Sequence, residues 1–173
     1  MAFYLPGFYG DLTALILFLI ASFTDFLDGM LARLLGEESK LGELLDPIAD
    51  KIIVAAALIL LVMDGTIRSY EVIAAIIILT REILVSGLRE FLAEGKIKLP
   101  VSNLAKLKTV LQMVSIALLL SGETGNKIIN FQDYNAQTIG IALLWLSAAL
   151  TLFTGYEYMR KGIDHAISED NKD

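Results

Sequence analysis

The sequence contains no cysteine, and its only histidine, His165, lies in a polar C-terminal segment. Without cysteine the chain can form no disulfide bond, thiolate metal site or cysteine nucleophile. A single histidine in a polar tail argues against a Ser-His-Asp triad and against a zinc site built from histidines. Any acid–base or metal chemistry must therefore be carried by carboxylates.

Charged residues are also scarce, at 20% of the 173 residues, whereas apolar and aromatic residues make up 55%. A soluble domain has about 25% charged and about 45–50% apolar residues. A helix needs about 20 mostly apolar residues to span a bilayer. Windows of that size can be drawn at residues 11–33, 43–63, 71–91, 104–121 and 138–159. We predict an all-α polytopic bundle of five transmembrane spans, a single domain over residues 1–173 with a polar cytoplasmic tail at 160–173.

Basic residues are outnumbered and unevenly placed. The chain has 14 Lys and Arg against 20 Asp and Glu, a net charge of −6, so no nucleic-acid partner is predicted. Most basic residues lie in or beside the connections 34–42 and 92–103 and the tail, whereas the opposite side has only Arg68 and Lys127. Because basic residues favour the cytoplasmic side, we expect both connections and the C-terminus to lie in the cytoplasm.

Aspartates recur at helical spacing in the first two predicted spans. Asp25 and Asp28 are three residues apart, and Asp46 and Asp50 are four apart. Residues so spaced share a face of a helix. The short connection makes the two spans an antiparallel pair, so the four carboxylates can meet in one cluster. A single aspartate here could be a helix–helix contact, but four in this pattern predict a site.

Such a cluster needs cations, because converging carboxylates repel one another in a low-dielectric site. Oxygen ligands without histidine or cysteine select Mg²⁺, Mn²⁺ or Ca²⁺. Two divalent ions about 4 Å apart are a known arrangement for displacement at phosphorus. A carboxylate could also act as general base toward an attacking hydroxyl. We therefore predict a two-ion site for phosphoryl chemistry.

The pattern Asp25-x2-Asp28-Gly29-x2-Ala32-Arg33-x8-Gly42-x3-Asp46-x3-Asp50 matches every position of a known signature. It resembles that of the CDP-alcohol phosphotransferase family of membrane enzymes. Residues 45–51, 81–90 and 104–109 are also similar to segments of the members that accept glycerol 3-phosphate. The resemblance covers the chain after about residue 10.

The resemblance implies a multi-pass protein of the bacterial cytoplasmic (inner) membrane, with its active site facing the cytoplasm and a two-ion Mg²⁺ or Mn²⁺ site. CDP-diacylglycerol would bind with its acyl chains in the lipid bilayer, and the hydroxyl of glycerol 3-phosphate would attack the β-phosphorus. The products would be phosphatidylglycerol phosphate and CMP. A homodimer is a further expectation from the family.

The resemblance also implies roles for the signature residues. The metal ligands would be Asp25, Asp28, Asp46 and Asp50, and Asp50 would also be the catalytic base. The nucleotide would be bound at Asp28, Gly29, Ala32, Arg33 and Gly42.

A basic cluster predicts where the acceptor phosphate binds. Arg81 lies near the middle of a predicted span, where a bare cation costs at least about 2.5–3.5 kcal/mol. We do not expect pairing with Glu82, because adjacent helical residues face different ways. Arg89 lies two turns further along, and Lys106 and Lys108 begin the next span. Such cations suit a phosphorylated acceptor, although the two lysines could also be ordinary flanking charges.

Other features indicate structure rather than function. Tyr156 and Tyr158 are expected to be interfacial aromatic residues. Residues 122–125, Gly-Glu-Thr-Gly, predict a turn. Family members usually have six spans, so the usual first helix of the bundle is expected to be missing here.

Two alternatives stay open at this point. The same family could use another acceptor, such as inositol phosphate, or phosphatidylglycerol in a cardiolipin synthase. A different class would be a cation transporter that uses the aspartates as its ion site. The outer halves of the predicted spans have almost no ionisable residues, which argues against a path open to both faces. Metal-dependent release of CMP distinguishes the enzymes from the transporter.

Overall fold

The computed structural model describes residues 8–35, 40–94, 102–129 and 135–170. Within these ranges it does not extend to the side chains of residues 8, 25–26, 28–35, 40–47, 50, 93–94, 161 and 164–170. All regular structure in the described ranges is helical. The helices are α1 (Phe8–Leu35), α2 (Lys40–Met63), α3 (Glu71–Glu94), α4 (Asn103–Leu120), α5 (Gly122–Ile128) and α6 (Ala136–Asp170).

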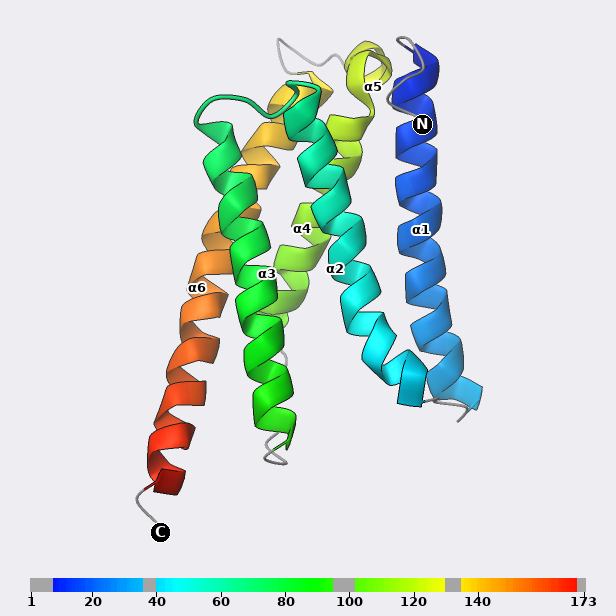
Figure 1. Cartoon of the computed structure of the whole chain (residues 1–173). Helices are drawn as coiled ribbons and strands as arrows, with labels where there is room; N and C mark the ends of the chain where they lie inside the picture. Colours follow the sequence, from blue (N-terminus) through cyan, green and yellow to red (C-terminus); the bar gives the residue numbers. More distant parts are fainter. Residues whose placement is uncertain (1–7, 36–39, 95–101, 130–134, 171–173) are drawn as a thin grey trace.

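The five long helices run up and down as an elongated bundle (Figure 1). At one end, the lower end in Figure 1, α1 and α3 finish and α2 and α4 begin, and α6 also finishes there. We call this the site end of the bundle. The short α5 lies at the opposite end, beside the start of α1. The alternation brings residues from distant parts of the sequence to the same level.

The predicted spans coincide with the five long helices, so the all-helical prediction is confirmed. In the described residues, two segments are long and apolar enough to cross a membrane: Asn103–Leu120 and Ala136–Arg160. Tyr9–Thr24 of α1 and Lys51–Met63 of α2 are shorter apolar segments. Charged residues, Arg81 and Glu82 among them, interrupt the apolar sequence of α3.

Two local predictions differ from the structure. The segment predicted as a turn at residues 122–125 begins the short helix α5 instead. In addition, α6 does not end near residue 159 but continues to Asp170, so most of the predicted polar tail is helical. No proline occurs between residues 160 and 170 to stop the helix.

The core lies where α4 and α6 pack against each other and against α3. Ile78 of α3, Ile116 of α4 and Leu144 of α6 are completely buried. The close approach of α4 and α6 depends on small residues. The Ser115 hydroxyl donates to the Gly140 carbonyl oxygen at 2.7 Å, and a Cβ at Gly140 would come within 2.8 Å of Leu119 Cδ2. This tight packing fixes the position of α6 relative to α4.

A polar contact joins α1 to α5 at the end opposite the site end. The backbone N–H of Glu123 donates to Asp11 Oδ2 at 3.1 Å. Gly122, just before it, has a φ of +51°, and a Cβ there would overlap the Asp11 carboxylate. Only glycine satisfies both requirements without strain.

Candidate active site

The four signature aspartates occupy facing parts of two neighbouring helices. Asp25 and Asp28 lie in the second half of α1, and Asp46 and Asp50 in the first half of α2. Gly29, Ala32, Arg33 and Gly42 belong to the same two stretches. The two helices are antiparallel and lie side by side at the site end (Figure 1). The side chains of these residues lie outside the described part, so their roles as metal and nucleotide ligands stay predictions.

Among the side chains that the structure describes, no group of three or more acidic or histidine residues could hold a metal ion. The signature aspartates, whose side chains lie outside the described part, stay the predicted ligands. Their donor set consists of carboxylate oxygens alone, and hard divalent cations such as Mg²⁺ and Mn²⁺ prefer such donors. The residues present thus fit the predicted metal site in chemistry and in their placement along the backbone.

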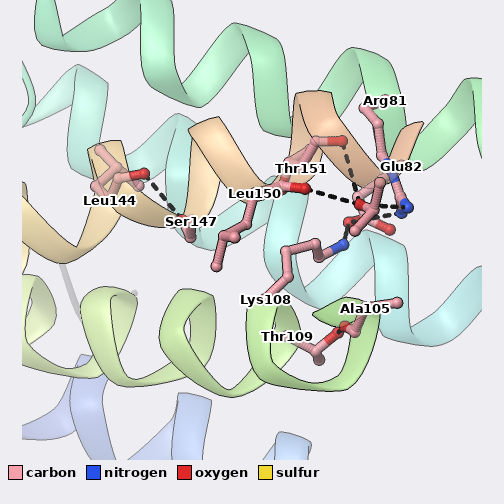
Figure 2. Close-up of polar contacts among 10 residues, drawn as sticks. Arg81, Glu82, Ala105, Lys108, Thr109, Leu144, Ser147, Leu150 and Thr151 are labelled. Atoms are coloured by element: carbon pink, nitrogen blue, oxygen red, sulfur yellow. Dashed lines mark hydrogen bonds and ion pairs between the residues drawn. The ribbon is translucent and has the colours of Figure 1, made fainter. Parts of the chain in front are cut away.

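Arg81 is held by residues of α6 (Figure 2). Its Nη2 donates to Thr154 Oγ1 at 3.1 Å, and its guanidinium lies over the Tyr158 ring, 5.8 Å from the centroid. The side chain of Arg81 is 11% exposed. A Cβ at residue 155 would come within 3.0 Å of Arg81 Cγ, so Gly155 leaves room for the arginine stem.

Glu82 joins Arg81 to Lys108 of the next helix (Figure 2). Glu82 Oε1 forms an ion pair with Lys108 Nζ, and Arg81 Nη1 lies 3.8 Å from the same oxygen. The expectation that Arg81 does not pair with Glu82 is therefore wrong. The rule considers only the directions of adjacent residues on one helix. Here Lys108 of α4 pairs with the Glu82 carboxylate, and the long Arg81 side chain reaches the same oxygen.

The predicted basic cluster divides into two parts. Arg81 and Lys108 come together around Glu82, and Lys108 is only 3% exposed, so it is not a flanking surface charge. Arg89 and Lys106 are exposed toward the site end, and no hydrogen bond or ion pair among the described side chains links them to Glu82. The buried pair and the exposed pair thus have different surroundings.

Sequence reasoning missed the contribution of α6. Tyr158 was expected at the interface, but it is 6% exposed and packs under Arg81. Thr154 is completely buried and accepts the hydrogen bond from Arg81. Ser147, Thr151 and Thr154 recur every three or four residues, and this polar line through an apolar helix was the available signal.

A hollow lies between α2, α3 and α4. Its lining residues are Lys51 and Val54 of α2, Glu82 of α3, and Thr109, Gln112 and Met113 of α4. Lys51 directly follows Asp50, so the hollow extends from the aspartate-bearing helix to the Glu82 network. Arg81 and Lys108 are not among these lining residues, but both contact Glu82, which is. Gln112 Oε1 and Arg81 Nε are buried and have no hydrogen-bond partner in the described part of the chain.

Known proteins resemble this chain over most of its length. The sequence pattern described as CDP-alcohol phosphatidyltransferase matches residues 1–153. A protein of Rickettsia bellii is 41% identical over 160 residues, which cover 92% of this chain and 84% of that protein. One from Cereibacter sphaeroides is 38% identical, covering 93% and 86%. One from Shigella flexneri is 36% identical, covering 92% and 83%. All three are named CDP-diacylglycerol–glycerol-3-phosphate 3-phosphatidyltransferase.

Proposed function

Because this chain belongs to the CDP-alcohol phosphatidyltransferase family, we propose that it transfers a phosphatidyl group from CDP-diacylglycerol to glycerol 3-phosphate. The observation that carries this conclusion is the similarity to relatives named for that reaction, which extends over 92% of the chain. The chain is an enzyme of this class. Its products are phosphatidylglycerol phosphate and CMP.

The reaction exchanges one phosphoester bond for another. A hydroxyl oxygen of glycerol 3-phosphate forms a bond to the β-phosphorus of CDP-diacylglycerol, and the bond from that phosphorus to the oxygen of CMP breaks. The hydroxyl proton passes to a base, for which we propose Asp50. The backbone places Asp50 in the first half of α2, one residue before Lys51, which lines the hollow.

The family generally depends on divalent metal ions. We propose that Asp25, Asp28, Asp46 and Asp50 hold Mg²⁺ or Mn²⁺, because their oxygen-only donor set suits such ions. Ions held there would supply positive charge to stabilise the pyrophosphate and the leaving CMP. The neighbouring Gly29, Ala32, Arg33 and Gly42 are proposed to bind the nucleotide. That assignment rests on the family resemblance.

The acceptor phosphate is proposed to bind near Arg81 and Lys108. Together with Glu82 these residues carry a net charge of +1, and Lys51 adds a further cation at the hollow. Because Glu82 lines the hollow and pairs with both cations, a phosphate that enters the hollow would take over contacts that Glu82 now makes. Among the described residues Arg81 Nε has no hydrogen-bond partner, so we propose it as a donor to the phosphate. Arg89 and Lys106, which are exposed toward the site end, would attract the anion as it approaches.

A lipid substrate agrees with the outer surface of the bundle. Large apolar side chains are exposed on each long helix, for example Leu17, Ile59, Ile76, Val110 and Leu152. Such a surface suits contact with acyl chains. We propose that the five long helices span a bacterial cytoplasmic membrane. The site end and the C-terminus would then face the cytoplasm, as the placement of lysine and arginine indicates.

The experiment that tests this function measures CMP release from CDP-diacylglycerol by the detergent-purified protein. Glycerol 3-phosphate, inositol phosphate, phosphatidylglycerol and serine are supplied separately, with Mg²⁺ or Mn²⁺ and with EDTA as the control. We expect CMP only with glycerol 3-phosphate and divalent metal. Release with a different acceptor would reassign the substrate, and metal-independent release would contradict the proposed role of the aspartates.

A further inference from the structure

Gln112 of α4 is a buried polar residue without a partner for its carbonyl oxygen. The residue is 3% exposed, and its Oε1 accepts no hydrogen bond in the described part of the chain. Nearly all buried polar groups in proteins have a partner. Gln112 nevertheless occupies a well-packed part of α4, three residues before the completely buried Ser115 and four before Ile116. The protein thus keeps a hydrogen-bond acceptor where no described protein group supplies the donor.

Gln112 lines the hollow at a defined position. Lys108 lies four residues before it on α4 and therefore on the same face, where it pairs with Glu82. Across the hollow is Lys51, the residue after Asp50. Gln112 therefore shares the hollow with Glu82, which contacts the proposed phosphate-binding cations, and with Lys51, which follows the proposed catalytic base in the sequence. An acceptor molecule bound in this hollow would lie beside the Gln112 amide.

The chemistry of glycerol 3-phosphate restricts which of its groups can satisfy Gln112 Oε1. Its phosphate, as a dianion, has only acceptors. The reacting hydroxyl has a single hydrogen, which it must give to the base as the new bond forms. The remaining donor is the second hydroxyl, on C2. That carbon also lies between the phosphate-bearing carbon and the reacting one.

We propose that Gln112 is a specificity-determining residue whose Oε1 accepts a hydrogen bond from the non-reacting hydroxyl of the acceptor. This inference rests on the proposed function. It defines the acceptor class as a monophosphate that carries a second hydroxyl beside the reacting one. A site built to bind a hydroxyl rejects an analogue that lacks it, because the buried protein group is then left unpaired.

The test compares glycerol 3-phosphate with 3-hydroxypropyl phosphate, which keeps the phosphate and the reacting hydroxyl but lacks the C2 hydroxyl. We expect wild-type kcat/KM to favour glycerol 3-phosphate by roughly 10- to 100-fold, as for a buried acceptor that loses its donor. In Gln112→Met, which keeps the shape of the side chain but has no amide, the preference should fall to about threefold or less.

The matched control is Gln137→Met. Gln137 is a half-buried glutamine at the other end of the bundle, and its Nε2 lies 3.5 Å from the Thr66 carbonyl oxygen. This variant should keep the wild-type preference between the two acceptors. A purely structural role for Gln112 would lower kcat/KM for both acceptors by the same factor in Gln112→Met.

Two results would overturn this inference alone: a wild-type enzyme that uses both acceptors equally well, or an unchanged preference in Gln112→Met. The first needs no variant, so it applies even if Gln112→Met fails to fold. No turnover of glycerol 3-phosphate by the wild-type protein would overturn the proposed function, and this inference with it.

Discussion

The α3–α4–α6 side of the bundle and the α1–α2 side hold their charges in different ways. On the first side, Arg81 and Lys108 are buried and share the Glu82 carboxylate, while Thr154 and Tyr158 hold the guanidinium from α6. On the second side, residues 25–50 carry seven acidic and two basic residues. One side contains its own counterions, whereas the other has an excess of negative charge.

The difference indicates how each side becomes ready for its substrate. A buried cation that is already paired and hydrogen-bonded keeps its position without a ligand. A group of carboxylates with few basic neighbours needs cations from solution to neutralise it. We therefore expect the acceptor side to be preorganised by the fold and the nucleotide side to be organised by metal. The following substitutions test this comparison.

Asp50→Asn should have the largest effect, because it removes the proposed base from the metal-dependent side. We expect CDP-diacylglycerol to bind nearly as in the wild type, while kcat falls by about 10²- to 10⁴-fold, as is usual for loss of a general base. Turnover is followed by CMP release, and lipid binding by titration with the nucleotide lipid. The control is Asp64→Asn, since Asp64 lies at the other end of the bundle, where it accepts a hydrogen bond from the Thr66 N–H. Wild-type turnover in Asp50→Asn would contradict the proposal that Asp50 is the general base.

Arg81→Ala should have the next largest effect, and on the acceptor side only. Loss of a charged partner for the phosphate should raise KM for glycerol 3-phosphate by about 10- to 100-fold. KM for CDP-diacylglycerol should change far less. Arg68→Ala removes an exposed arginine at the opposite end and serves as the control. Equal increases in both KM values would mean that Arg81 does not belong to the acceptor site.

Thr154→Val should have a smaller effect in the same direction. The valine has nearly the shape of threonine but cannot accept the hydrogen bond from Arg81 Nη2. We expect KM for glycerol 3-phosphate to rise by about 3- to 10-fold with little change in kcat, which corresponds to one hydrogen bond. Thr154→Ser restores the hydroxyl and should restore KM. An equal loss in Thr154→Ser would show that packing of the methyl group, and not the hydrogen bond, matters at this position.

Gly122→Ala should have the smallest effect on activity, because it lies at the end remote from both sides of the site. The φ of +51° and the overlap with Asp11 should lower the free energy of unfolding by about 1–2 kcal/mol or more. Thermal unfolding in detergent measures this loss. The kcat and both KM values of the folded protein should stay within about twofold of wild type. A selective change in one KM would mean that the two ends of the bundle are coupled.

The long helices could be predicted from the sequence because apolar runs of about 20 residues favour one structure in a bilayer. The short α5 could not, since residues 122–125 show turn chemistry and the contact that holds them comes from Asp11, 112 residues away. Local patterns do not contain such contacts. The extension of α6 beyond residue 159 was missed because a polar sequence was equated with an irregular tail.

The candidate site shows the same division. The charge of Arg81 within an apolar helix predicts a functional site, which stays a prediction, and the structure shows Arg81 and Lys108 on the same Glu82 carboxylate. The partners of that network were missed, because Thr154 lies 73 residues from Arg81 in sequence. Glu82 was excluded as a partner of Arg81 because adjacent residues on a helix face different ways. Its ion pair with Lys108 comes from another helix, which that argument does not consider.

The contact between Asp11 and Glu123 also sets an order of events during synthesis. The two residues are 112 positions apart, and ribosomes add about 5–20 residues per second, so roughly 6–20 s separate their appearance. During that interval α1 exists without the partner that holds its first turn. Nascent chains released before residue 123 lack this contact altogether, so the first helix to be made is among the last to be fixed at the end opposite the site end.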